Sequence, residues 1–219
     1  MKVELLFITP NAEKLIESIG RTSYLSFERQ GVNTEKKFIR MLMKRGHFSV
    51  LEHAYATFRI SGVSRVFTHQ IVRHRLCSYT QQSQRRVDES NFRYIEPASI
   101  RDHSSAHVLF VEFMNQANRT YTELQKMGIN NEDARFVLPN ATESMIVVTA
   151  NFRQWRHIIE LRGNTEAQWE MRKVAIEILK ILQHHVPTVF EDFDIDLEKD
   201  VIRKKQNLIS THINQSQIV

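Results

Sequence analysis

The chain has 219 residues, a formal net charge of +5 at pH 7 and a single cysteine. Its 42% hydrophobic and 25% charged residues suit a globular protein, and its few glycines and prolines exclude collagen-like and linker-rich classes. The single cysteine, Cys77, excludes an internal disulfide and fits a reducing compartment, so we expect a cytoplasmic protein.

No apolar run reaches the roughly 18–20 residues of a membrane span, and the N-terminal stretch is too short and too acidic for a signal peptide. We therefore expect no membrane partner. The sequence has no HExxH motif, and one cysteine cannot form a zinc site by itself, so we expect no metal. The basic charge suggests anionic partners such as nucleic acid, nucleotides or phosphorylated cofactors, although solubility alone explains a charge of this size.

Apolar periodicity, capping residues and glycines predict the elements of the chain. In chain order these are a strand over 3–8, helices over 11–19 and 35–45, a strand over 53–61, a helix over 64–77, a strand over 91–95, helices over 104–127 and 131–139, a strand over 143–151, and helices over 152–161 and 166–185. Gly20 is expected to end the first helix, and residues after 197 are expected to form a polar, frayed tail.

The clearest strand is 53–61, in which Ala54, Ala56, Phe58 and Ile60 alternate with polar residues. Strands and helices do not alternate regularly, so the sequence predicts an α+β fold: a mixed core with antiparallel strands and long helices in one domain over 1–219. Neither GxGxxG nor a P-loop occurs, and any nucleotide must therefore be bound by another device.

An unusual basic window lies between His53 and Val87. It contains six arginines, no lysine and no acidic residue. Arginines without sequence-local carboxylates favour bidentate recognition of phosphate or carboxylate groups. The alternative is that they form ion pairs with acidic residues distant in sequence.

On the helix predicted over 64–77, Gln70, Arg73, His74 and Cys77 share one face by their spacing. The polar run 78–84 that follows could read the edge of a base and a sugar, or it could be an ordinary polar loop. Cys77 could be a nucleophile activated by its basic neighbours, but a small, partly buried residue is the better interpretation.

Two further polar clusters stand at junctions between elements. Residues 45–53 join a helix to a strand. Asn151, Arg153 and His157 begin the helix after strand 143–151, and a helix N-terminus favours anions. Arg162 follows in the same helix.

The sequence Arg73-His74-Arg75, seven residues and then Ser83 resembles the RHR-x7-S signature of the flavin-dependent thymidylate synthases. Further segments match this family in the same order. They are Arg21-Thr22-Ser23, Gly46-His47-x-Ser49-x-x-Glu52-His53, Gln70-x-x-Arg73, Arg135-x-x-Leu138-Pro139, Asn151-x-Arg153-x-x-x-His157, Leu161-Arg162 and Ala167-Gln168-Trp169-Glu170. The resemblance covers roughly residues 20 to 190.

The resemblance implies a homotetramer with active sites where subunits meet. It implies bound FAD and the reductive methylation of dUMP to dTMP. The carbon donor is 5,10-methylenetetrahydrofolate, NADPH reduces the flavin, and no residue of the enzyme acts as a nucleophile.

The resemblance also implies roles for individual residues. Arg162 is the catalytic residue that faces the uracil. The FAD site is implied to contain Ser49, Arg73, His74, Arg75, Gln81, Asn151, Arg153 and His157. The dUMP site is implied to contain Gln70, Arg73, Gln81, Gln82, Ser83, Gln84, Arg85, Arg135 and Arg162. Some family members carry glutamate where this chain has Gln81, and glutamine can hydrogen-bond there but cannot act as a base.

Two other functions remain open at this stage. A non-catalytic nucleic-acid-binding protein would explain the basic charge and the helix with Arg73, His74 and Arg75, but lysines and stacking aromatics are not interleaved with these arginines. A different flavin or nucleotide enzyme with the same fold is the other.

Overall fold

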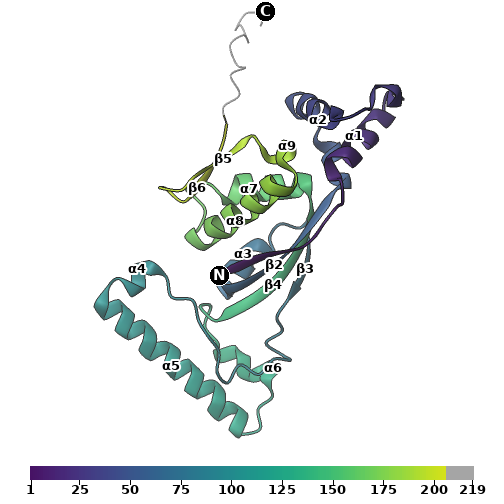
Figure 1. Ribbon diagram of the computed structural model, residues 1–219. Coiled ribbons are helices and arrows are strands. Elements are labelled where there is room, and N and C mark those ends of the chain that lie inside the picture. Colours follow the sequence, from purple (N-terminus) through teal and green to yellow (C-terminus); the bar gives the residue numbers. More distant parts are fainter. Residues whose placement is uncertain (206–219) are drawn as a thin grey trace, which may run out of the picture.

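The computed structural model describes residues 1–205 and consists of helices arranged around one antiparallel sheet (Figure 1). The strands are β1 Lys2–Ile8, β2 Tyr55–Ser64, β3 Ser78–Gln81, β4 Glu143–Asn151, β5 Phe193–Asp196 and β6 Val201–Lys204. The α-helices are α1 Ala12–Thr22, α2 Thr34–Lys44, α3 Arg65–Ile71, α4 Ala98–Arg101, α5 Ser104–Lys126, α6 Asn131–Ala134, α7 Phe152–Arg162, α8 Trp169–His185 and α9 Pro187–Phe190. Short 3-10 helices are Phe27–Arg29, Phe48–His53 and Arg135–Val137.

The main sheet has the order β1-β2-β4-β3 and is antiparallel throughout, while β5 and β6 form a separate hairpin. Apolar and polar side chains alternate along β2, and this alternation determines which face of the strand is buried. Ala56, Phe58 and Ile60 are fully buried, as the sequence predicts. Helices α3, α7 and α8 cover that face, where Trp155 of α7 stacks edge-on against Phe58 at 5.1 Å between ring centroids. The α+β prediction is confirmed.

Helix α9 packs on α8, while α1 and α2 lie at one end of the sheet and α4, α5 and α6 at the other (Figure 1). Helices α1 and α2 pack together at one end, where a Cβ on Gly20 would lie 2.6 Å from the ring of Phe38. Gly20 therefore lies inside α1 at a close helix contact and does not end the helix, contrary to the sequence prediction. At the other end, Met114 and Ala117 of α5 pack with Phe92 in a small, separate hydrophobic cluster.

The helix predicted over 64–77 is shorter than expected. Ser64 caps it by accepting a hydrogen bond from the Phe67 N–H, as predicted, but α3 ends at Ile71. The hydroxyl of Tyr79 donates to the carbonyls of Ile71 (2.6 Å) and His74 (2.8 Å), which satisfies backbone groups that a longer helix would have paired. The shared helical face predicted around Arg73 is therefore wrong.

Other boundaries also differ from the sequence prediction. The polar run that begins at Ser78 is strand β3, whereas 91–95 forms only an isolated bridge from Tyr94 to Thr142. Helix α8 begins at Trp169 because the Gln168 side chain caps it, not Thr165. Residues 201–204 pair in the C-terminal hairpin, although a frayed tail was expected from 197. The remainder of that expected tail, 206–219, lies outside the described residues. One domain over 1–219 stays a prediction.

Candidate active site

The centre of the candidate site is a contact between α7 and the segment that links α3 to β3. The Nε–H of Arg162 donates to Nε2 of His74 at 3.0 Å, and the His74 and His157 rings meet edge-on with centroids 5.7 Å apart. His74 is 5% exposed. The structure thus brings together Arg162 and two of the predicted FAD-site residues.

His74 is held in its neutral form. The pKa of His74 is lowered from the usual 6.5 to about 4. Burial is the main cause, and the neighbouring Arg162 and His157 contribute to the same shift. Because Nε2 accepts the Arg162 hydrogen bond, the ring proton of neutral His74 is on Nδ1. The Arg162 side chain uses only its Nε–H in this contact. Its two Nη groups make no hydrogen bond within residues 1–205 and can donate to a ligand.

A cavity of about 310 Å³ lies beside the start of α7, between the ends of α1 and α2. Ser49 and Arg153 line it, together with His47 and Ser23. Arg153 pairs with Glu52 at 2.5 Å. Two more of the predicted FAD-site residues therefore face the same cavity.

Asn151 positions this part of the site from the end of β4. Its Oδ1 accepts a hydrogen bond from the Gln154 N–H at 2.8 Å and so begins α7. The resemblance assigns the Asn151 side chain to FAD. Within the described residues, this side chain caps the helix that carries Arg153 and His157.

The next group lies on β3, where alternate side chains turn inward. The Gln81 amide donates to the hydroxyls of Thr68 (2.9 Å) and Ser144 (3.3 Å), and its oxygen makes no hydrogen bond within residues 1–205. The neighbouring Gln82 donates to Glu89 at 3.1 Å. Burial is the main cause that raises the pKa of Glu89, and the neighbouring Asp88 also raises it, while the hydrogen bond from Gln82 and the charge of Arg65 lower it in part.

The third group lies around α6. Arg85 pairs with the Glu132 carboxylate at 2.5 Å, and the Nε–H of Arg135 donates to the Glu132 carbonyl at 3.0 Å. Burial lowers the pKa of Arg65, and the nearby Arg135 guanidinium lowers it further. Like charges gathered in this way are suited to a phosphate. A cavity of about 600 Å³ lies beside this group and is lined by Arg85, Arg86 and Glu132.

The arginines of the basic window divide into two kinds. Arg85 pairs with Glu132, and Arg59 lies 3.9 Å from Glu4, so the distant ion pairs considered as an alternative do form at these positions. Within the described residues, no carboxylate lies within ion-pair distance of Arg73, Arg75 or Arg86. These guanidinium groups remain available to an anion.

Some predicted residues are not joined to a cluster. Ser83 contributes its carbonyl to a turn, accepting from the N–H groups of Arg86 and Val87, and Gln70 and Gln84 make no side-chain hydrogen bond within residues 1–205. Sequence reasoning missed Tyr79 and Glu132. Neither carries a local signal, because each is significant only through a contact with a distant segment.

Cys77 is not activated in this environment. Burial is the main cause that raises the pKa of its thiol, although hydrogen bonds with Tyr79 and Gln154 lower it in part. A thiol kept protonated is a poor nucleophile. The interpretation of Cys77 as a partly buried structural residue agrees with this environment.

No group of three or more His, Cys, Asp or Glu side chains in 1–205 could hold a metal ion. His103 and His107, four residues apart at the start of α5, gather no third ligand there; His107 instead contacts Glu96 at 2.7 Å. None of the helices in this part of the chain is long and apolar enough to cross a membrane.

The fold and the site define a class of protein: an α+β protein that, within residues 1–205, carries several guanidinium groups without a carboxylate partner, as suits phosphorylated ligands. Comparison with known proteins identifies the family. Residues 4–188 match the family model described as thymidylate synthase complementing protein.

Curated relatives agree with this match. The flavin-dependent thymidylate synthase of Corynebacterium glutamicum is 40% identical over 206 residues, which cover 86% of this chain and 82% of the relative. That of Geobacter sulfurreducens is 40% identical over 200 residues, covering 88% and 86%. The chain belongs to the flavin-dependent thymidylate synthase family, and the resemblance seen in its motifs is confirmed.

Solved structures show the same fold. A crystal structure of the flavin-dependent thymidylate synthase of Helicobacter pylori, complexed with FAD and dUMP, has a TM-score of 0.73 and 23% identity. The match covers 88% of this chain and 99% of that one. A second structure of the Helicobacter pylori enzyme with FAD and dUMP has a TM-score of 0.74 and 24% identity.

Proposed function

We propose that this protein catalyses the reductive methylation of dUMP to dTMP, with FAD as bound cofactor and 5,10-methylenetetrahydrofolate and NADPH as co-substrates. Membership of the family supports this reaction, as do the FAD and dUMP named for the Helicobacter pylori structures of the same fold. FAD supplies the hydride that completes the methyl group; the protein's own residues bind, orient and polarise the substrates.

The observation that carries the proposal is the state of Arg162. Its Nε–H is held by neutral His74, and its Nη groups make no hydrogen bond within residues 1–205. A planar guanidinium with two free donors can hydrogen-bond along one edge of a uracil ring and stabilise negative charge that develops there. This electrostatic activation needs no nucleophile, which agrees with the protonated state of Cys77.

The residues around this centre fit a dinucleotide with two phosphates. Arg73 and Arg75 have no acidic partner among the described residues and flank His74 in the sequence, while Ser49 and Arg153 line the cavity at the start of α7. Guanidinium groups match phosphate oxygens bidentately. We assign these residues, with Asn151, Gln81 and His157, to FAD.

The dUMP phosphate is assigned to Arg85 and Arg135, whose guanidinium groups converge on Glu132. Gln70, Gln81, Gln82, Ser83, Gln84 and Arg73 complete the assigned dUMP site. Gln81 presents its free oxygen as an acceptor, because its amide donates to Thr68 and Ser144.

We further propose a homotetramer with active sites between subunits. The assigned residues fall into separate groups on one chain, which is expected if neighbouring copies complete each site. Helix α5 supports this arrangement, because Val108 (54% exposed), Leu109 (68%) and Phe113 (58%) present apolar side chains far from the main core (Figure 1). A cytoplasmic location remains a prediction from the single cysteine.

The test is dTMP formation by Arg162→Ala, with all substrates supplied and FAD content measured. The substitution is expected to abolish synthesis while most FAD stays bound, because Arg162 is assigned to the uracil. Retained synthesis would refute the role of Arg162. A wild-type protein that binds nucleic acid but forms no dTMP would refute the proposed reaction itself.

A further inference from the structure

The C-terminus of α7 is held by an unusually close contact with the β5–β6 hairpin. The N–H of Ile202 donates to the carbonyl of Gly163 at 2.7 Å. A Cβ built on Gly163 would lie 2.6 Å from both Cβ and Cδ1 of Ile202 and 2.7 Å from the Ile159 carbonyl oxygen. Only a residue without a side chain allows the hairpin to approach α7 this closely. Gly163 directly follows Arg162.

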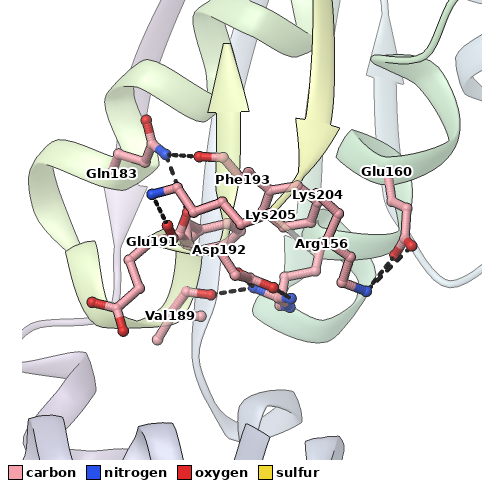
Figure 2. A network of polar contacts seen from close by, with 10 residues as sticks. Arg156, Glu160, Gln183, Val189, Glu191, Asp192, Phe193, Lys204 and Lys205 are labelled. Carbon is pink, nitrogen blue, oxygen red and sulfur yellow. Dashed lines mark hydrogen bonds and ion pairs between the residues drawn. The ribbon is translucent and has the colours of Figure 1, made fainter. Parts of the chain in front are cut away.

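The hairpin contacts α7 at two more points along the same face. Asp192, at the start of the hairpin, accepts two hydrogen bonds from the Arg156 guanidinium, at 2.7 and 2.6 Å (Figure 2). Lys204 of β6 lies 3.2 Å from Glu160. Positions 156, 160 and 163 are separated by four and three residues and so share one side of the helix.

These contacts differ in strength. The Arg156 side chain is 6% exposed, donates also to the Val189 carbonyl, and lies 4.7 Å from the centroid of the Phe193 ring. The Lys204–Glu160 pair is exposed and contributes little. The buried Arg156 pair and the Ile202–Gly163 contact therefore fix the helix against the hairpin.

The other sides of α7 carry the groups assigned to the reaction. His157 and Arg162 meet His74, which belongs to the segment before β3. The N-terminus of α7 is fixed by β4 and the Asn151 cap, and α8 packs along the helix. The contact at Gly163 holds its C-terminal end against the hairpin. A shift of that end moves Arg162 relative to His74.

We propose that the β5–β6 hairpin is a positioning element of the active site, in which Ile202 and Gly163 act as positioning residues for Arg162. The inference rests on the proposed function, which gives Arg162 its contact with the uracil. Neither residue is assigned to substrate; the backbone hydrogen bond between them and the packing of the Ile202 side chain on Gly163 together set where the guanidinium lies. A misplacement of about 1 Å in such a group can lower a rate on the order of 100-fold.

The experiment compares FAD-loaded wild type, Gly163→Ala and Gly31→Ala. The control makes the same chemical change where the nearest atom to a new Cβ is 3.8 Å away. For Gly163→Ala, kcat is expected to fall at least tenfold, with a smaller change in KM for dUMP and unchanged FAD content, because Arg85 and Arg135 still hold the phosphate. The spectral change of the flavin on adding dUMP should also decrease.

A rescue variant separates positioning from general damage. Adding Ile202→Gly to Gly163→Ala removes the Ile202 atoms that the new Cβ would meet but leaves the close contact with the Ile159 carbonyl oxygen, so turnover should recover only in part. A folded Gly163→Ala protein with kcat and the dUMP-induced spectral change within twofold of wild type would overturn the proposal. If Gly163→Ala does not fold, Ile202→Ala decides: a several-fold lower kcat with bound FAD supports the proposal, and unchanged kcat overturns it.

The same assay distinguishes this inference from the proposed function. If wild type forms no dTMP, the proposed function fails. If wild type is active, Arg162→Ala is inactive and the Gly163 and Ile202 variants retain full turnover, only the positioning role fails.

Discussion

Replacing His74 with glutamine removes an ionisable group from the centre of the site and keeps a hydrogen-bond acceptor for Arg162. In the folded protein, burial first and then the charges of Arg162 and His157 lower the pKa of His74 from 6.5 to about 4. In the unfolded chain, the imidazole titrates near its ordinary value.

The effect on stability follows from this difference. Between pH 6.5 and pH 4 the unfolded state binds more protons at His74 than the folded state, so stability falls as the pH falls through this range. The contribution of neutral His74 is complete above pH 6.5, and no further loss occurs below pH 4. With about 1.4 kcal/mol for each pKa unit, the loss is at most about 3.5 kcal/mol.

The assay is denaturant unfolding of wild type and His74→Gln between pH 4 and pH 7, with the imidazole followed by NMR. The free energy of unfolding of wild type should decrease relative to that of the variant as the pH falls from 6.5 to 4. A stability difference that does not change over this range, or a His74 resonance that titrates near pH 6.5, would refute the reasoning.

Three further predictions concern the surroundings of the site. Glu132→Gln should tighten dUMP binding several-fold in a titration at low salt, because the substitution frees Arg85 from a competing carboxylate; unchanged affinity would contradict the assignment of Arg85. Glu170→Ala should lower the free energy of unfolding by about 3 kcal/mol, measured with urea, because the buried carboxylate accepts the N–H and hydroxyl of Ser64 at 2.8 and 2.5 Å; a loss below about 1 kcal/mol would show that water replaces it. Cys77→Ser should leave dTMP formation within twofold of wild type, and a loss of synthesis would revive Cys77 as a nucleophile.

Periodicity predicts those parts of the fold in which one face is uniformly apolar. Strand β2 and helix α5 follow directly from the residues, because their buried positions repeat at the period of their own secondary structure. Strand β3 could not be predicted in this way, since Ser78 to Gln81 are largely polar and pair with β4 far along the chain. Its register depends on Tyr79, which reaches back to the end of α3.

The C-terminal hairpin shows a second limit. Val201 and Ile202 stand among charged residues, so the local sequence predicts a tail. Both are buried, and Ile202 packs where Gly163 has no side chain beside α7. The local sequence around Ile202 contains no signal for this contact with a distant glycine.

The site likewise contains residues that the sequence predicts and partners that it does not reveal. Motif order predicts that Arg162, His74 and His157 belong together, and the structure places them in contact. The carboxylates that restrain the arginines are tertiary partners: Glu132 for Arg85 is separated from it by an entire helix. Counting charges within residues 53–87 therefore finds the arginines but misses acidic partners that lie elsewhere in the chain, such as Glu132.

The absorption spectrum of the purified protein, recorded before and after addition of dUMP, tests the central claim most directly. The account predicts flavin bands that shift when dUMP is added, because both ligands are assigned to residues around Arg73 and Arg162. A protein that takes up no FAD, or whose flavin bands are unchanged by saturating dUMP, would contradict a shared site for the two ligands.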